Sequence, residues 1–218
     1  MEEADLSVGA VEGVFGMAWL EAMIYGDADH AGPSPMHSRR DALVAASDIV
    51  SAIRRLSNRV AADVVTTVGE LEVSPGSINV VPAETRLTID VRSYDDDTVA
   101  KLVDRVEREI KAACNREDVT YDLAEIWRIP HTDFSPRVSQ TVLHAAETVE
   151  ADHQAMVSGA GHDATYLNEI TDAAMIFVPS VNGKTHNEAE YTEWEDAVAG
   201  AQTLAEATKQ LASRPDNT

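Results

Sequence analysis

A strand pattern followed at once by a helix pattern occupies the middle of the chain, in residues 86–114, which read RLTIDVRSYDDDTVAKLVDRVEREIKAAC. Leu87, Ile89 and Val91 alternate with polar residues, as in a strand with one buried face. The acidic run 95–97 then favours a helix start, because negative side chains stabilise the N-terminal end of a helix. Apolar residues recur after it at spacings of three and four, which predicts an amphipathic helix. They are Val99, Leu102, Val103, Val106, Ile110 and Ala113.

Strand and helix patterns alternate on both sides of this stretch, and together they span residues 11–130. Turn signals separate them, among them Pro33 and Pro35 in one loop and the pair Pro75-Gly76 in another. The predicted elements are an extended stretch in residues 10–28 that Gly13 and Gly16 interrupt, a helix over 38–56, strands in 63–73 and up to residue 92, a helix over 99–113 and a strand in 119–127. The order β-α-β-β-α-β is that of the ferredoxin-like fold, an α+β arrangement with both helices on one face of an antiparallel sheet.

The pattern changes after Pro130, where helices and short buried strands alternate in the order α-β-α-β-α. That order is typical of an α/β layer, which we assign to residues 131–218 together with residues 1–10. Two strands are predicted there, at residues 156–157 and 173–178, and we expect them to be parallel. Because two parallel strands do not form a stable sheet by themselves, we expect further strands from additional chain, a partner chain or an oligomer.

The chain of 218 residues is strongly acidic, with 38 Asp and Glu against 17 Lys and Arg and a net charge of −21. Such a charge repels phosphate groups, which argues against binding to nucleic acid or to an anionic membrane. The acidic and lysine-poor composition resembles that of halophilic proteins, and an ordinary acidic protein is the alternative. A single cysteine, Cys114, excludes an internal disulfide and favours a cytoplasmic location. We find no apolar run of about 18 residues that could span a membrane, and no signal-peptide layout.

Two clusters of candidate functional residues lie in the first 130 residues. His30 lies in a Gly- and Pro-rich loop, where a positioned imidazole can donate a ring N–H to a developing oxyanion; a turn histidine without a role is the alternative. Asn79 and Arg92 lie near the two ends of a strand pattern. Arg92 can bind a carboxylate through two hydrogen bonds, with Asn79 as an added donor. On the residues alone, an ion pair of Arg92 with Asp90 or Asp95 is the preferred interpretation.

Two further clusters lie in the last 90 residues. Residues 158–164, SGAGHDA, place glycines between a strand and a helix, where backbone N–H groups can approach a ligand; a plain tight turn is the alternative. Residues 184–190, KTHNEAE, follow a buried strand, and a neutral His186 there can bind zinc or manganese. One histidine is not a metal site, and the chain contains no HExxH, paired-cysteine or Gly-x-Ser-x-Gly motif.

Four stretches of sequence, which include these clusters, follow one another in an order that is typical of a known family. They are GDADHAG (26–32) with Pro35-Met36 and RDA (40–42), NVVP (79–82) with DVR (90–92), SGAGHDA (158–164), and MIFVPS (175–180) with His186-Asn187 and Glu190. In this combination the chain resembles the second half of the N-carbamoyl-L-amino-acid hydrolase and allantoate amidohydrolase family, which are dinuclear-metal amidohydrolases related to zinc aminopeptidases. GKTHN at residues 183–187 departs mildly from the Gly-Ile-Ser-His-Asn of many members.

The resemblance implies a role for each candidate in one active site. It implies that His30 reaches from a lid domain into an active site, usually that of the partner subunit, and stabilises the tetrahedral oxyanion. It implies that Asn79 and Arg92 hold the carboxylate of a small-molecule substrate. Gly161 and His162 then line the substrate pocket.

The resemblance also implies a metal site and a division into domains. His186 is implied as a ligand to one of two divalent metal ions, zinc or manganese. Residues 11–130 are implied to form the lid, through which a homodimer assembles, and residues 1–10 and 131–218 to form parts of a metallopeptidase-like catalytic domain.

The family's other metal ligands and its general base have no match here. We therefore expect an incomplete portion of a hydrolase of ureido or amide carbon–nitrogen bonds, completed by a separate N-terminal half. The alternatives are a non-catalytic remnant or dimerisation module, and a metallopeptidase or deacylase of the same superfamily.

Overall fold

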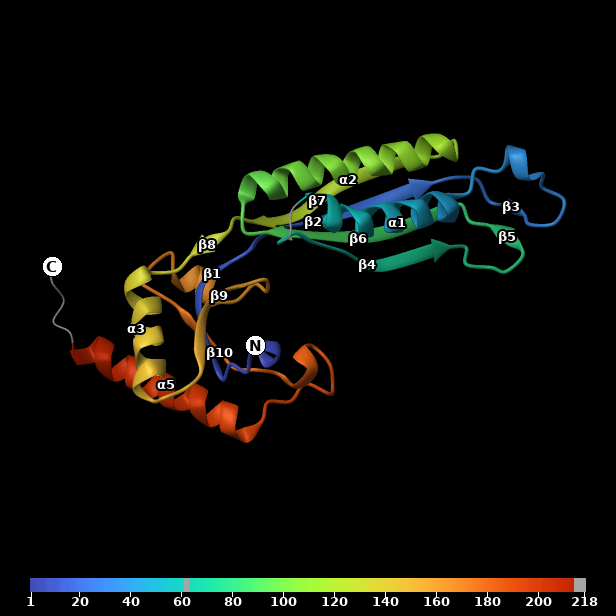
Figure 1. The fold of residues 1–218 in the computed structure, drawn as a ribbon. Helices are drawn as coiled ribbons and strands as arrows, with labels where there is room; N and C mark the ends of the chain where they lie inside the picture. Colours follow the sequence, from blue (N-terminus) through green and yellow to red (C-terminus); the bar gives the residue numbers. More distant parts are fainter. Residues whose placement is uncertain (61–62, 214–218) are drawn as a thin grey trace. The chain divides into compact units, whose positions relative to one another are not determined.

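The computed structural model describes residues 1–60 and 63–213 and divides into two compact units (Figure 1). Unit 1 comprises residues 1–15 and 132–218, and unit 2 comprises residues 16–131. Unit 2 was predicted to span residues 11–130, so the first point at which the chain passes from unit 1 to unit 2 lies five residues later than expected. Among the described residues, no helix is long and apolar enough to cross a membrane.

Unit 2 is a four-stranded antiparallel sheet with two helices, in the predicted order β-α-β-β-α-β. Its strands lie in the spatial order β4-β6-β2-β7, and each neighbouring pair is antiparallel. The elements are β2 (Gly16–Tyr25), α1 (Ala42–Val60), β4 (Val65–Ser74), β6 (Glu84–Ser93), α2 (Asp96–Arg116) and β7 (Thr120–Ile129). A small sheet of β3 (Asp29–His30) and β5 (Val80–Val81) extends beyond one end of the larger sheet (Figure 1).

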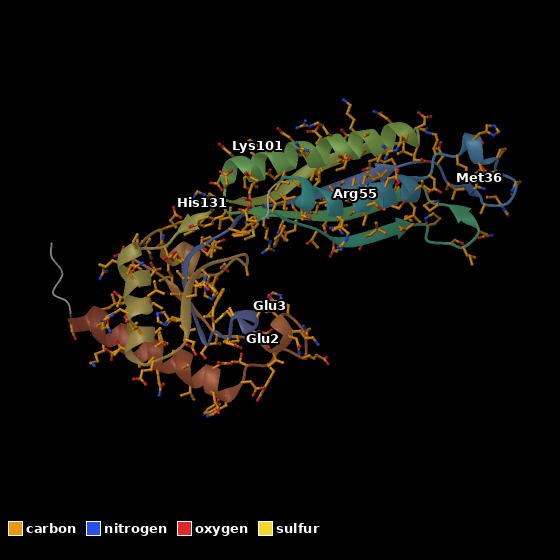
Figure 2. All side chains as sticks on the ribbon, viewed as in Figure 1. Glu2, Glu3, Met36, Arg55, Lys101 and His131 are labelled. Atoms are coloured by element: carbon orange, nitrogen blue, oxygen red, sulfur yellow. The ribbon has the colours of Figure 1, made fainter. Side chains whose placement is uncertain are left out.

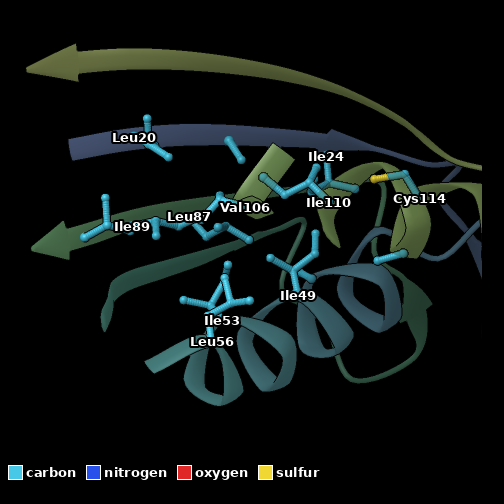
Figure 3. Packing of buried hydrophobic residues seen from close by; sticks show 14 of the residues in the cluster. Leu20, Ile24, Ile49, Ile53, Leu56, Leu87, Ile89, Val106, Ile110 and Cys114 are labelled. Atoms are coloured by element: carbon cyan, nitrogen blue, oxygen red, sulfur yellow. The ribbon is translucent and has the colours of Figure 1, made fainter. Parts of the chain in front are cut away.

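Both helices of unit 2 pack on the same face of its sheet. Charged residues such as Arg55 and Lys101 lie on the exposed sides of α1 and α2 (Figure 2). The apolar stripes of the helices face alternate residues of the strands and form one core (Figure 3). Its fully buried members include Leu20, Ile24, Ile49, Ile53, Leu87, Ile89, Leu102 and Ile110. The strand alternation and the helix periodicity of the sequence therefore meet in a single buried layer.

The helix starts follow from side-chain caps. The Asp95 carboxylate accepts a hydrogen bond from the backbone N–H of Thr98 (3.1 Å), so α2 begins at the acidic run that predicted it. For α1 the predicted start at residue 38 was too early. Asp41 accepts hydrogen bonds from the backbone N–H groups of Leu43 (2.9 Å) and Val44 (3.2 Å), and the helix begins at Ala42.

Unit 1 is a mixed sheet whose central strand is β1 (Val8–Val14). This strand is parallel to β9 (His153–Ser158) on one side, and antiparallel to β10 (Met175–Phe177) and β8 (Thr132–Asp133) on the other. The remaining elements of unit 1 are the helices α3 (Pro136–Thr148), α4 (Ala164–Leu167) and α5 (Trp194–Ser213), and the 3-10 helices η1 (Glu2–Ala4) and η3 (Val181–Gly183). A further 3-10 helix, η2 (Met36–Ser38), belongs to unit 2. Ala10 of β1 packs on α3 and α5, whereas Val11 and Val14 pack in a second cluster, so both faces of the strand are buried.

The extended stretch of residues 10–28, which Gly13 and Gly16 were expected to interrupt, forms two strands, β1 and β2, that are separated at Phe15 and belong to different units. The expected parallel pairing of the two later strands was wrong. The two strands predicted after residue 150 pair with β1 and not with each other, and the chain itself supplies β1 and β8 to the sheet. Gly16 marks the break, because a Cβ there would lie 2.6 Å from Asp96 Oδ1 and 2.8 Å from the backbone nitrogen of His131.

The reactivity of the Cys114 thiol is a probe of whether unit 2 is folded. The side chain is 1% exposed, and burial raises the pKa of its thiol to about 11. Because the thiolate is the reactive form, we expect alkylation by iodoacetamide at pH 8 to be at least about 100-fold slower in the native protein than in denaturant. Mass spectrometry over time measures both rates. Equal rates would contradict the burial of this helix face.

Candidate functional site

The loop between β3 and α1 holds His30 in a defined position. The Asp29 carboxylate accepts hydrogen bonds from the Ser34 hydroxyl (2.6 Å) and the His30 backbone N–H (2.7 Å). Both hydrogen bonds lower the pKa of Asp29 below its usual value, and the bond from Ser34 has the larger effect. The Arg39 guanidinium donates to the carbonyl oxygens of Ala31 (2.7 Å) and Ser34 (3.0 Å). Side chains thus brace an exposed loop whose composition alone predicts only a turn.

The ring of His30 has a defined tautomer when it is neutral. The backbone N–H of Gly32 donates to His30 Nδ1 at 3.0 Å. A ring nitrogen that accepts a hydrogen bond carries no proton, so the proton of the neutral ring is on Nε2. His30 is exposed, and its imidazole can therefore donate one N–H to an external acceptor.

Asn79 lies beside His30, although 49 residues separate them in the chain. His30 is paired with Val80 across the β3–β5 sheet, and the carbonyl oxygen of Asn79 accepts a hydrogen bond from the backbone N–H of Ala31 (2.9 Å). The side-chain oxygen of Asn79 accepts from the Ser77 hydroxyl at 3.0 Å. The structure therefore brings two of the predicted site residues together at one end of unit 2.

Arg92 lies on β6 and forms an ion pair with Asp90, as the residues alone favoured. Its Nε donates to both carboxylate oxygens of Asp90, at 2.9 and 3.0 Å. Hydrogen bonding to Asp90 raises the pKa of Arg92, and burial opposes this effect. The Nε1–H of Trp19 also donates to Asp90 Oδ2, at 3.2 Å. Sequence analysis missed this neighbour, although Trp19 belongs to a strand pattern that was recognised.

Asn79 and Arg92 of one chain do not meet. Glu84, at the start of β6, is on the Asn79 side, and Arg92 is eight residues further along the strand. At 3.3–3.4 Å per residue this separation is about 27 Å. Figure 2 marks the two ends, with Met36 in the loop of His30 and His131 just after the strand that lies beside the Arg92 end. One small ligand cannot touch both residues in a single chain.

Residues 158–164 form a short turn in unit 1. The Ser158 hydroxyl accepts a hydrogen bond from the Ala160 N–H (3.1 Å) and donates to the Ala160 carbonyl oxygen (2.8 Å). The N–H of Ala164 donates to His162 Nδ1 at 3.1 Å, which leaves the ring proton of neutral His162 on Nε2. Gly161 and His162 are both exposed in this turn.

His186 lies in the loop between β10 and α5, in the left-handed region with φ of 57°. Its backbone N–H donates to the Glu190 carboxylate at 2.9 Å. Thr185 and Glu190 line a cavity of about 830 Å³ within unit 1. Among the described residues, no group of three or more His, Cys, Asp or Glu side chains could hold a metal ion. Within the part of the chain that the structure describes, the residues therefore do not fit a complete metal site.

Comparisons with known proteins agree with the motifs. The family model described as Peptidase family M20/M25/M40 matches residues 7–210. The N-carbamoyl-L-amino-acid amidohydrolase of Paenarthrobacter aurescens is 34% identical over 211 residues, covering 97% of this chain and 51% of that protein. The allantoate amidohydrolase of Escherichia coli is 32% identical over 213 residues, covering 97% and 52%.

A solved structure resembles the whole chain. It is an amidase of the hydantoinase/carbamoylase family from Burkholderia multivorans, with a TM-score of 0.91, 36% identity, and coverage of 98% of this chain and 52% of the other. The chain spans about half the length of the curated relatives it matches.

Proposed function

The chain belongs to Peptidase family M20/M25/M40, and from that membership we propose that it supplies the substrate-positioning part of a hydrolase of non-peptide carbon–nitrogen bonds. The proposed substrates are N-carbamoyl-L-amino acids or allantoate-like ureido compounds, because the similar proteins carry those names. The observation that carries the proposal is the hydrogen bond from Gly32 N–H to His30 Nδ1, which leaves Nε2–H as a donor.

In this proposal the two ends of unit 2 perform different tasks. When water attacks the carbonyl carbon, negative charge develops on the carbonyl oxygen, and His30 Nε2–H donates a hydrogen bond to it. Asn79, which lies beside His30, is proposed as a second donor to the substrate carboxylate. Arg92 binds the substrate carboxylate, and the Asp90 pair fixes the plane of its guanidinium beforehand. Gly161 and His162 line the pocket from unit 1.

The separation of the two ends supports a role for a second copy of the chain. Glu84, at the end of β6 nearer His30 and Asn79, lies about 27 Å from Arg92 along the strand, which exceeds the length of an amino-acid-sized substrate. We propose that His30 and Asn79 of one subunit and Arg92 of another complete each site. Unit 2 would then be a ferredoxin-like lid and dimerisation domain, and unit 1 part of the catalytic domain.

A metal role is proposed for His186 alone among the residues of this chain. Two divalent ions, zinc or manganese, would supply an activated water molecule when bound. The remaining ligands and the general-base carboxylate would come from a further polypeptide segment, in keeping with the length of the relatives. We place the enzyme in the cytoplasm of a salt-rich cell, which suits its single cysteine and its charge of −21.

Fragment complementation tests this function. The chain is mixed with the non-matching half of the Paenarthrobacter aurescens relative, in molar KCl with manganese or zinc, and assayed on N-carbamoyl-L-amino acids, allantoate and dipeptides. We expect turnover of the ureido substrates that a chelator abolishes. Cleavage of dipeptides alone would favour a metallopeptidase. Dimerisation of the chain without turnover in any combination would favour a non-catalytic module.

Arg92→Ala is expected to raise KM for carboxylate substrates in the assembled enzyme by about 10- to 100-fold, with little change in kcat. The reason is that Arg92 binds a group of the substrate that does not react. Arg86→Ala is the matched control, because Arg86 lies on the same strand and face, in ion pairs with Glu21 (2.7 Å) and Glu70 (2.8 Å). Equal changes in KM for both variants would contradict the assignment.

A further inference from the structure

Two tryptophans lie together on the face of the unit 2 sheet that the helices do not cover. Trp19 of β2 is directly opposite Asp90 of β6 and Trp127 of β7, so the three side chains share one face. The centroids of the two indole rings are 4.8 Å apart, and the ring planes are inclined at 47°. Trp19 remains 42% exposed. Large aromatic surface is thus presented to solvent next to a charged pair.

A β-bulge brings Trp127 to this face. Leu123 of β7 is opposite Ala22 and packs in the helix-side core. Further along, Glu125 is opposite Leu20 but Trp127 is opposite Trp19, so β7 contains one extra residue between them. Without the extra residue, regular alternation from Leu123 would direct Trp127 toward the helices. Bulges of this kind re-aim side chains and are frequent beside active sites.

Asp90 ties the aromatic pair to Arg92. Its carboxylate accepts from Trp19 Nε1 (3.2 Å) and from Arg92 Nε (2.9 and 3.0 Å). Arg92 is directly opposite Met17, so Trp19 is its diagonal neighbour, at about 7–8 Å. That span suits one amino-acid-sized ligand with a carboxylate at one end and an apolar group at the other.

The character of the same face changes toward its other end. There Arg86 lies between Glu21 and Glu70, at 2.7 and 2.8 Å. The aromatic surface of Trp19 and Trp127 therefore lies at the same end of this face as Arg92, the cation proposed to bind the substrate carboxylate. A ligand that binds here would therefore carry an anionic group for Arg92 and an apolar group for the two indole rings.

We propose that Trp19 and Trp127 form the side-chain subsite for the substrate whose carboxylate Arg92 binds, and that they select N-carbamoyl-L-amino acids with aromatic or large apolar side chains. The inference rests on the proposed function and adds the substrate class. An aromatic side chain gains apolar contact and ring–ring contact with the indoles. Asp90 is a positioning residue, because it acts through Trp19 and Arg92.

Saturation-transfer NMR titrations of the 218-residue chain test this subsite without metal or turnover. The probes are N-carbamoyl-L-phenylalanine and N-carbamoylglycine, which share the ureido and carboxylate groups. We expect the phenylalanine ligand to bind about tenfold more tightly. Trp19→Leu with Trp127→Leu should bring this ratio close to one and leave the glycine ligand unaffected. Trp194→Leu is the matched control, since Trp194 is 76% exposed on α5 of unit 1.

The outcomes separate this inference from the proposed function. Equal affinity for the two probes, a ratio unchanged by the double substitution, or no binding of either probe overturns the subsite. Arg92→Gln should weaken both probes. If it weakens neither while the ratio persists, the carboxylate assignment fails and the aromatic subsite stands. Trp19→Phe retains a ring and should keep most of the ratio, and slow labelling of Cys114 verifies that unit 2 of each variant is folded.

Discussion

His30→Ala is expected to lower kcat of the assembled, metal-loaded enzyme by about 100- to 1000-fold, with little change in KM. The hydrogen bond from Nε2–H strengthens only as charge develops on the carbonyl oxygen, so its loss affects the transition state more than substrate binding. His30 is exposed, and the bonds that shape its loop come from Asp29 and Arg39. The free energy of unfolding should therefore change little, and steady-state kinetics should report the chemistry alone.

Two substitutions make this result specific. His37→Ala is the matched control, because His37 is an exposed histidine of the 3-10 helix η2 in the same loop. We expect it to retain kcat. His30→Gln places an amide donor near the same position and should recover part of the loss. An equal loss of kcat in the His30 and His37 variants would show that the loop, and not the imidazole, matters.

Gly26→Ala is expected to destabilise unit 2 by about 3 kcal/mol or more, because overpacking against rigid backbone is among the most costly substitutions. A Cβ on Gly26 would lie 2.0 Å from the Arg40 carbonyl oxygen and 3.1 Å from the Ala42 nitrogen. The same carbonyl accepts a hydrogen bond from Asp27 N–H at 2.9 Å, which closes the base of the loop that carries His30. A shift of Arg40 would therefore displace the site as well as the fold.

Denaturant titration followed by Cys114 alkylation measures this loss in unit 2 alone. Gly159→Ala is the control, since a Cβ there would meet no heavy atom of the described residues within 4 Å apart from its own chain neighbours. It should unfold at the same denaturant concentration as the unsubstituted protein. If Gly26→Ala did so too, the close approach between residues 26 and 40 would not exist in solution.

Local patterns predicted the elements of unit 2 because each depends on neighbours within four residues. The stripe from Val99 to Ala113 lies within α2, and Asp95 caps its start. The pairing of Arg92 with Asp90 was also readable, because residues two apart on a strand share one face. Within the candidate site, sequence pattern identified the loop of His30 as a place where a side chain is held, but not the bond from Gly32 that defines its tautomer.

The errors concern contacts between residues far apart in the chain. Gly13 and Gly16 indicated that the extended stretch of residues 10–28 is interrupted, but only the pairing partners of its two halves show that β1 and β2 belong to different sheets. The motifs already placed Asn79 and Arg92 near the two ends of a strand pattern, and the register of β6 adds the distance between those ends; their shared role at a carboxylate stays a prediction.

By itself the sequence determined the periodicity of helices and strands, the turn positions, the acidic surface and the family motifs, since these depend on residue type and short spacing. Tertiary structure alone decided which strands share a sheet, that His30 lies beside Asn79 and apart from Arg92, and that Trp127 stands next to Trp19. Strand pairing joins residues across loops of any length, and one bulged residue reverses the face of all that follow. No pattern within a few residues specifies such partners.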